Sequence, residues 1–229
     1  MYLSRLILNP RSRQVQRELA DLYEMHRTVC RAFPNESFRD NESSGVLFRV
    51  DLHPRTRIPT LLVQSRQIPD WDFLQADRKN YLLGKADLPL GEKNPDFKEM
   101  NLQLRDGQVL AFRLCANPTV KKDRPDQPEK KQGRRVGLIR EEDQLAWLKR
   151  KIEAAGGALV SAQLVRETKL RAKLFIEKED ERRMRFVSVQ FDGILQVKDP
   201  VTLVKSIQSG IGSGKGLGFG LLSLAPVTQ

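Results

Sequence analysis

The pattern of the fold is set by residues 1–33, which read MYLSRLILNP RSRQVQRELA DLYEMHRTVC RAF. Residues 2–8 are mostly apolar and predict a β-strand, which Asn9-Pro10 ends. From residue 11 to 33 the apolar positions recur at spacings of three and four, which predicts a helix in one piece or two. Its buried stripe consists of Leu19, Leu22, Met25, Val29 and Phe33.

The segments that follow complete one recognisable order of elements. Two strands are predicted at about 45–53 and 59–66, followed by a weak helix from Trp71 and a loop over residues 80–100. A hairpin is predicted from 101–105 and 108–116, because Asp106-Gly107 between them is a strong turn signal. The order strand, helix, strand, strand, helix, strand is that of a βαββαβ, ferredoxin-like unit.

The second half repeats this architecture. The predicted elements are a short strand at 136–139, a helix at 141–155, strands near 158–165, 170–176 and 184–197, a helix from Asp199 to about 208, and a strand at 221–224. We therefore predict an α+β fold with two tandem ferredoxin-like (RRM-like) domains at 1–118 and 136–229. Residues 119–135, rich in proline and basic residues, are predicted to be a basic linker.

The charge of the chain indicates its partners. The 229 residues carry 40 Lys and Arg against 29 Asp and Glu, a net charge of +11. Such an excess favours a polyanionic partner, most often nucleic acid, or a place as a basic subunit in an assembly. Two cysteines make no disulfide framework, which favours a cytoplasmic location, and no apolar run is long enough to predict a membrane span.

Four side chains of the first helix form the candidate catalytic group. Tyr23, His26, Arg27 and Arg31 fall on a face beside the buried stripe. An imidazole, a phenol and guanidinium groups can move protons beside a phosphate and offset its charge without a metal. The alternative is that His26 is an ordinary residue of a helix surface.

Other chemistry at these positions finds less support. Cys30 and His26 are spaced for a nucleophile and its base, but no third group that orients the base is evident. The two histidines and two cysteines lack the ligand spacing of zinc sites, so neither a metal nor another cofactor is expected.

A second unusual segment is the glycine-rich run GIGSGKGLGFG at 210–220. Lys215 is followed by glycine, and the run lies after a helix and before a strand, so it is neither a nucleotide-phosphate loop nor a dinucleotide fingerprint. Two interpretations remain. The bare main chain around Gly212, Gly214, Lys215 and Gly216 can approach an RNA backbone, or the run is a tight connection where side chains would clash.

A basic stretch from 166 to 185 is a further candidate for RNA contact. On a hairpin, alternate residues such as Lys169, Arg171 and Lys173 project to one face, and Arg166 precedes them. The alternative is a solvated strand surface. Because the A-form major groove is narrow, contact with RNA phosphates is expected rather than base reading along the stem.

Several segments in order along the chain resemble one known family. The glycine run with Leu221-Leu222-Ser223-Leu224-Ala225-Pro226 is similar to the signature of the CRISPR-associated repeat-processing endoribonucleases. Three more segments, Met1-Tyr2-Leu3-Ser4 with Tyr23 to Arg27, Phe112 to Pro118, and Ala146-Trp147-Leu148, resemble its CasE branch from type I-E systems.

This resemblance implies a specific activity. Members of the family cut CRISPR repeat RNA at the 3′ base of a stem-loop without a metal, by attack of a ribose 2′-OH. They then usually keep the product as a subunit of the interference complex. By resemblance, His26 and Tyr23 are the catalytic residues, and Arg31 stands where relatives often have a lysine. A protein that is a monomer when free is expected, and a non-catalytic RNA-binding subunit is the alternative.

Overall fold

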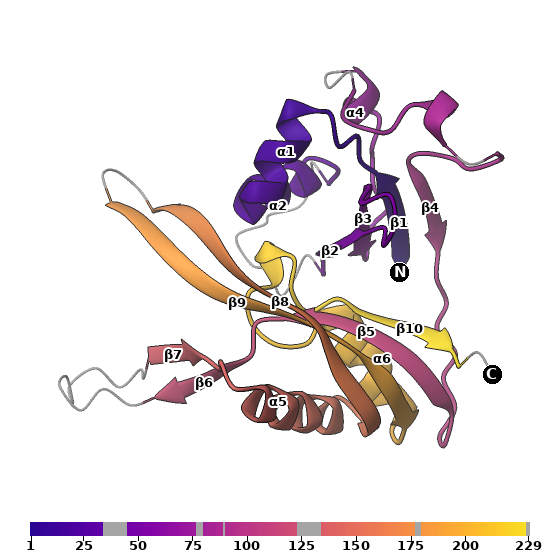
Figure 1. Ribbon diagram of the computed structural model, residues 1–229. Helices are drawn as coiled ribbons and strands as arrows, with labels where there is room; N and C mark the ends of the chain where they lie inside the picture. The colour runs from indigo at the N-terminus through magenta and orange to yellow at the C-terminus, as the bar shows by residue number, and fades with distance from the viewer. Residues whose placement is uncertain (34–44, 77–79, 89, 123–133, 177–179, 228–229) are drawn as a thin grey trace.

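The computed structural model describes residues 1–33, 45–76, 80–88, 90–122, 134–176 and 180–227, without the side chains of 122, 134 and 168–185. Two four-stranded antiparallel sheets dominate it, together with a separate two-stranded ribbon (Figure 1). None of the described helices is long and apolar enough to cross a membrane.

The first sheet has the strand order β2-β3-β1-β4. Its elements are β1 (Tyr2–Ile7), α1 (Arg13–Ala20), α2 (Leu22–Cys30), β2 (Leu47–Leu52), β3 (Pro59–Ser65), α4 (Phe73–Ala76), the 3₁₀ turn η1 (Lys85–Asp87) and β4 (Asp96–Glu99). Leu6, Met25, Val29 and Val63 are fully buried in the core between the sheet and the helices. The predicted apolar stripe therefore faces the sheet at these helical positions.

The predicted helix at 11–33 is divided into α1 and α2 by Asp21. The backbone of Asp21 is extended, with φ −134° and ψ 99°, and its carboxylate accepts a hydrogen bond from the N–H of Tyr23 at 3.0 Å. An aspartate in this position satisfies a free N–H group at the start of a helix. Asp21 thus begins α2 just before the candidate catalytic residues.

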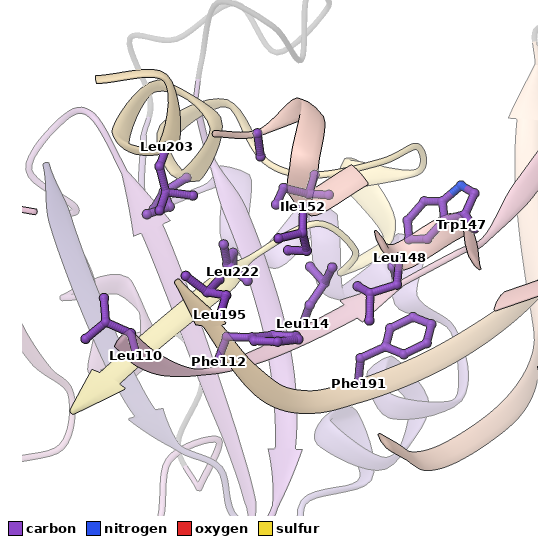
Figure 2. Packing of buried hydrophobic residues seen from close by; sticks show 14 of the residues in the cluster. Leu110, Phe112, Leu114, Trp147, Leu148, Ile152, Phe191, Leu195, Leu203 and Leu222 are labelled. Atoms are coloured by element: carbon purple, nitrogen blue, oxygen red, sulfur yellow. The ribbon is translucent and has the colours of Figure 1, made fainter. Parts of the chain in front are cut away.

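The second sheet has the strand order β10-β5-β9-β8. Its unit contains β5 (Val109–Ala116), α5 (Glu141–Ala154), β8 (Gly157–Ile176), β9 (Asp180–Val197), α6 (Pro200–Ser209), the 3₁₀ turn η2 (Lys215–Leu217) and β10 (Leu222–Pro226), with the ribbon β6 (Thr119–Lys122) and β7 (Arg134–Gly137) inserted after β5. Figure 2 shows Leu114 and Phe191 of the sheet facing Leu148 and Ile152 of α5. Both sheets have the antiparallel order of a βαββαβ unit, which confirms the prediction of tandem ferredoxin-like domains.

The predicted hairpin at 101–116 is wrong. Residues 101–105 form no strand, and β5 pairs with β9 and β10 of the second sheet. The turn at Asp106-Gly107 exists, with φ +77° at Gly107, but it joins two segments that do not pair. Leu102 and Leu104 alternate as in a strand because both pack against the second core. The last strand of the first sheet is instead β4, inside the predicted loop at 80–100.

Other predicted boundaries also change. Residues 136–139, predicted as the first strand of the second domain, overlap β7, which pairs with β6 outside the main sheet. Residues 119–122 of the predicted linker form β6, whereas 123–133 lie outside the described residues. The strands predicted near 158–165 and 170–176 are one strand, β8, whose pairing shifts by a residue at two places. The domain boundaries stay a prediction, and the pairing of β5 favours a division between Glu99 and Val109.

Candidate RNA-cleavage site

Helix α2 brings Tyr23 and His26 together, three residues apart. The centroids of their rings are 6.4 Å apart. Both side chains are partly buried, and Tyr23 lies in the first turn that Asp21 caps. The two rings are therefore close enough for one ribose-phosphate unit to reach both.

The surroundings of His26 hold its ring in place. On one side the ring stacks with Phe48 of β2, at a centroid distance of 6.3 Å. The sulfur of Cys30, one turn along α2, lies 3.5 Å from Nε2 and 3.7 Å from Nδ1. Burial lowers the pKa of His26, because the charged imidazolium loses solvation in these surroundings. His26 is thus neutral at pH 7 in the free protein and able to accept a proton.

Cys30 does not act as a nucleophile in this arrangement. Burial raises the pKa of its thiol to about 12, so the thiolate that would attack is essentially absent at neutral pH. The protonated thiol can donate a weak hydrogen bond to a nitrogen of His26. Cys30 is therefore a neutral neighbour of the imidazole, within reach of both ring nitrogens.

The two arginines predicted beside His26 differ in their placement. The side chain of Arg27 is 66% exposed and forms an ion pair with Glu24 at 3.3 Å. Such an exposed pair is weak, so Arg27 can turn toward a phosphate at little cost. Arg31 lies just after α2, with its guanidinium 4.5 Å from the ring centroid of Phe73. The catalytic role of Arg31 stays a prediction.

The glycine-rich run, which we call the glycine loop (residues 210–220), packs against this site. Leu217 and Phe219 form a buried cluster against which Tyr23 packs. Gly218 has φ +79°, and an added Cβ would lie 3.0 Å from the ring of Phe48. The loop is therefore a tight connection in which a side chain would clash, as one interpretation predicted. Gly212, Gly214, Lys215 and Gly216 are partly exposed, and their contact with RNA stays a prediction.

A cavity of about 240 Å³ lies between the first sheet and the second, and Phe48, which stacks on His26, is part of its wall. It is lined by Phe48 and Arg49 of β2, by Phe219 of the glycine loop, and by Cys115 and Arg166 of the second sheet. Arg166 is exposed, so it can supply positive charge close to α2. By contrast, Lys169, Arg171 and Lys173 lie in β8, where side chains are outside the description, so their predicted RNA contacts are untested.

A buried arginine that no sequence motif singles out joins the two sheets. Arg49 is 3% exposed, and its guanidinium makes two hydrogen bonds of 2.9 Å with the carboxylate of Asp51. Its Nη1 also donates to the backbone oxygens of Arg113 at 3.3 Å and Leu221 at 3.2 Å. The alternation of side chains along a strand does not show which residue will contact another domain. No signal in the sequence therefore identifies Arg49 as a link between the sheets.

No group of three or more His, Cys, Asp or Glu residues that could hold a metal ion occurs in the part of the chain that is described. The site consists instead of one imidazole, one phenol and nearby guanidinium groups.

Comparison with known proteins decides the family. The model of the family described as "CRISPR associated protein" matches residues 1–226. The chain belongs to this family. Within the family, it is 33% identical to the CRISPR-associated endoribonuclease Cse3 of Thermus thermophilus over 99% of the chain and all of the relative. It is 32% identical to the Cascade subunit CasE of Escherichia coli over the same shares.

A solved structure of this family has the same fold. Thermus thermophilus Cse3 bound to an RNA that represents a pre-cleavage complex superposes with a TM-score of 0.79 at 32% identity, covering 98% of each chain. The resemblance to CRISPR-associated endoribonucleases is thereby confirmed over the full length.

Proposed function

We propose that this protein is a metal-independent endoribonuclease that cuts CRISPR repeat RNA at the 3′ base of its stem-loop. The observation that carries the proposal is the pair of Tyr23 and His26, with ring centroids 6.4 Å apart on α2, where Tyr23 packs against the glycine loop. Its relative from Thermus thermophilus, similar over the whole length, is named an endoribonuclease.

The reaction needs no group beyond the RNA and these side chains. The 2′-oxygen of one ribose forms a bond to the adjacent phosphorus, and the bond from phosphorus to the 5′-oxygen of the next nucleotide breaks. The 2′-hydroxyl gives its proton to a base, and the leaving oxygen receives a proton from an acid. The products carry a 2′,3′-cyclic phosphate and a 5′-hydroxyl.

The protonation and charge of each side chain decide which of these tasks it performs. His26, neutral in the free protein, accepts the proton of the 2′-hydroxyl, because burial lowers its pKa. Tyr23 donates to the leaving oxygen or orients the phosphate. Arg27 and Arg31 supply positive charge for the phosphorane, and Arg166 extends that charge across the cavity.

This assignment predicts the dependence of the reaction on pH. Since the pKa of His26 lies below 6.5, kcat/KM is constant on the neutral side and falls about tenfold per pH unit once His26 becomes protonated. The measurement is kcat/KM for a repeat hairpin between pH 4.5 and 8. A rate that instead falls as the pH rises through 6 would assign His26 the role of the acid.

The alternative is a non-catalytic RNA-binding subunit, because ferredoxin-like units also occur in RNA-binding modules. End-labelled repeat hairpin incubated with the protein in EDTA separates the two functions. We expect one cut at the 3′ base of the stem. Intact RNA after prolonged incubation, for a repeat from the source genome that the protein binds tightly, would favour the alternative.

We further propose that the protein keeps its product and serves in a type I-E interference complex in the cytoplasm. The support is the similarity to CasE of Escherichia coli, which is named a Cascade subunit. The net charge of +11 suits retention of a cleaved RNA.

A further inference from the structure

A second cavity meets the glycine loop at Gly212 and Ser213, and Tyr23 does not line it. Its volume is about 260 Å³, and it lies between the β6–β7 ribbon, α5 and the beginning of the loop. Four basic residues line it, namely Lys121, Arg135, Arg150 and Lys151. We call this cavity the basic pocket.

The walls of the basic pocket come from a strand pair and a helix. Lys121 and Arg135 are directly opposite each other in the pairing of β6 and β7, so their side chains project to the same face of the ribbon. Arg150 and Lys151 come from α5, and the Nζ of Lys151 lies 6.0 Å from the ring centroid of Trp147. The cations are therefore gathered by the fold and are not a chance run in the sequence.

The glycine loop closes the pocket and connects it to the catalytic helix. A Cβ at Gly212 would lie 3.2 Å from the ring of Trp147, so the loop rests directly on α5 at this point. Tyr23 packs against the cluster of Leu217 and Phe219, five and seven residues further along the loop. An extended chain spans at most about 3.6 Å per residue, so Gly212 at the pocket and Phe219 are within about 25 Å of each other.

Within the described part of the chain, no acidic partner balances the charge in the pocket. Among the described residues, no acidic side chain lines it, and none of its four cations makes an ion pair. Four like charges around a small cavity repel one another, and a bound anion relieves that repulsion. The pocket thus favours an anionic ligand.

We infer that the basic pocket binds a backbone phosphate of the single-stranded RNA that flanks the stem-loop. This inference rests on the proposed function, because it takes the same RNA to be bound at α2. A cavity of about 260 Å³ accepts a phosphate with its ribose but not a duplex. A flexible single strand can insert one phosphate into such a pocket, and a positively charged groove is the usual way to bind it.

The test compares two double variants that remove the same charge. Arg135→Gln with Arg150→Gln changes the pocket, whereas Arg140→Gln with Lys149→Gln changes exposed residues of the same region outside it. Each is titrated with two non-cleavable repeat RNAs that carry a 2′-deoxynucleotide before the cut. One is the bare stem-loop, and the other has single-stranded flanks. Circular dichroism checks that each variant is folded.

We expect the pocket variant to bind the flanked RNA about tenfold more weakly and its plot of log affinity against log salt to flatten by about 0.7 to 1.4. Its affinity for the bare stem-loop, and both affinities of the control variant, should equal those of the wild type. Equal losses on both RNAs, or equal losses in both variants, would overturn the inference. Unchanged affinity of the pocket variant for both RNAs would also overturn it. If that variant then failed to bind a partner subunit, the ligand of the pocket would be an acidic protein.

The outcomes for the pocket and for the proposed function are separable. The pocket variant could lose affinity for the flanked RNA alone while the wild-type protein cuts no repeat RNA. That result would support the pocket and reject the nuclease. If the wild-type protein cuts the repeat but the pocket variant binds the flanked RNA as tightly as the wild type does, only the pocket is rejected.

Discussion

The His26→Ala variant is expected to cut repeat RNA about 10²–10⁴-fold more slowly than the wild type and to bind it with the same affinity. The loss follows from removing the group that accepts the proton of the 2′-hydroxyl. Affinity is retained because most of it comes from contacts between basic side chains and phosphates, which His26 does not make. Single-turnover cleavage and a binding titration on the same RNA measure the two quantities.

The chain provides a matched control in its only other histidine. His53 lies in an exposed turn, where its Nδ1 accepts a hydrogen bond from the N–H of Thr56 at 3.2 Å. His53→Ala should therefore leave the cleavage rate unchanged. A loss of less than about tenfold in His26→Ala, or an equal loss in His53→Ala, would remove His26 from the mechanism.

The Arg49→Met variant is expected to lose about 3–5 kcal/mol of stability. Methionine roughly fills the space of the arginine stem but leaves Asp51, 20% exposed, without its partner. The backbone oxygens of Arg113 and Leu221 also lose their donor, which loosens the contact between the two sheets. Urea denaturation followed by circular dichroism measures the change.

A surface arginine of the same first sheet is the control. Arg5 is 38% exposed and lies 3.3 Å from Glu92, a pair worth about 0–1 kcal/mol. Arg5→Met should therefore change the stability by no more than that. If Arg49→Met is as stable as Arg5→Met, the buried arginine does not hold the two sheets together.

The sequence predicted elements well where local patterns decide them. The buried positions Met25 and Val29 of α2 and the helix α5 follow from apolar residues at helical spacing and were placed correctly, whereas Leu22 of the predicted stripe is only partly buried and lines a cavity. Strand β5 was assigned to the wrong sheet, because the alternation from 108 to 116 shows a strand but not its partner. The partner lies in β9, far along the chain, and only the three-dimensional pairing reveals it.

The same limit applies to the candidate site. Tyr23 and His26 share one helix, so their proximity could be predicted from spacing alone. Phe48, which stacks on His26, comes from a strand, and the loop residues against which Tyr23 packs come from the other end of the chain. Contacts between distant elements leave no periodic trace in the sequence.

The most direct test of the proposed mechanism replaces one oxygen of the substrate. A repeat hairpin with a single 2′-deoxynucleotide immediately before the cut is incubated with wild-type protein in EDTA, beside the all-ribose hairpin. Our mechanism predicts that the ribose hairpin yields a 2′,3′-cyclic phosphate and a 5′-hydroxyl, whereas the deoxy hairpin is bound equally well and never cut. Cleavage of the deoxy hairpin at the same position would contradict attack by the 2′-hydroxyl.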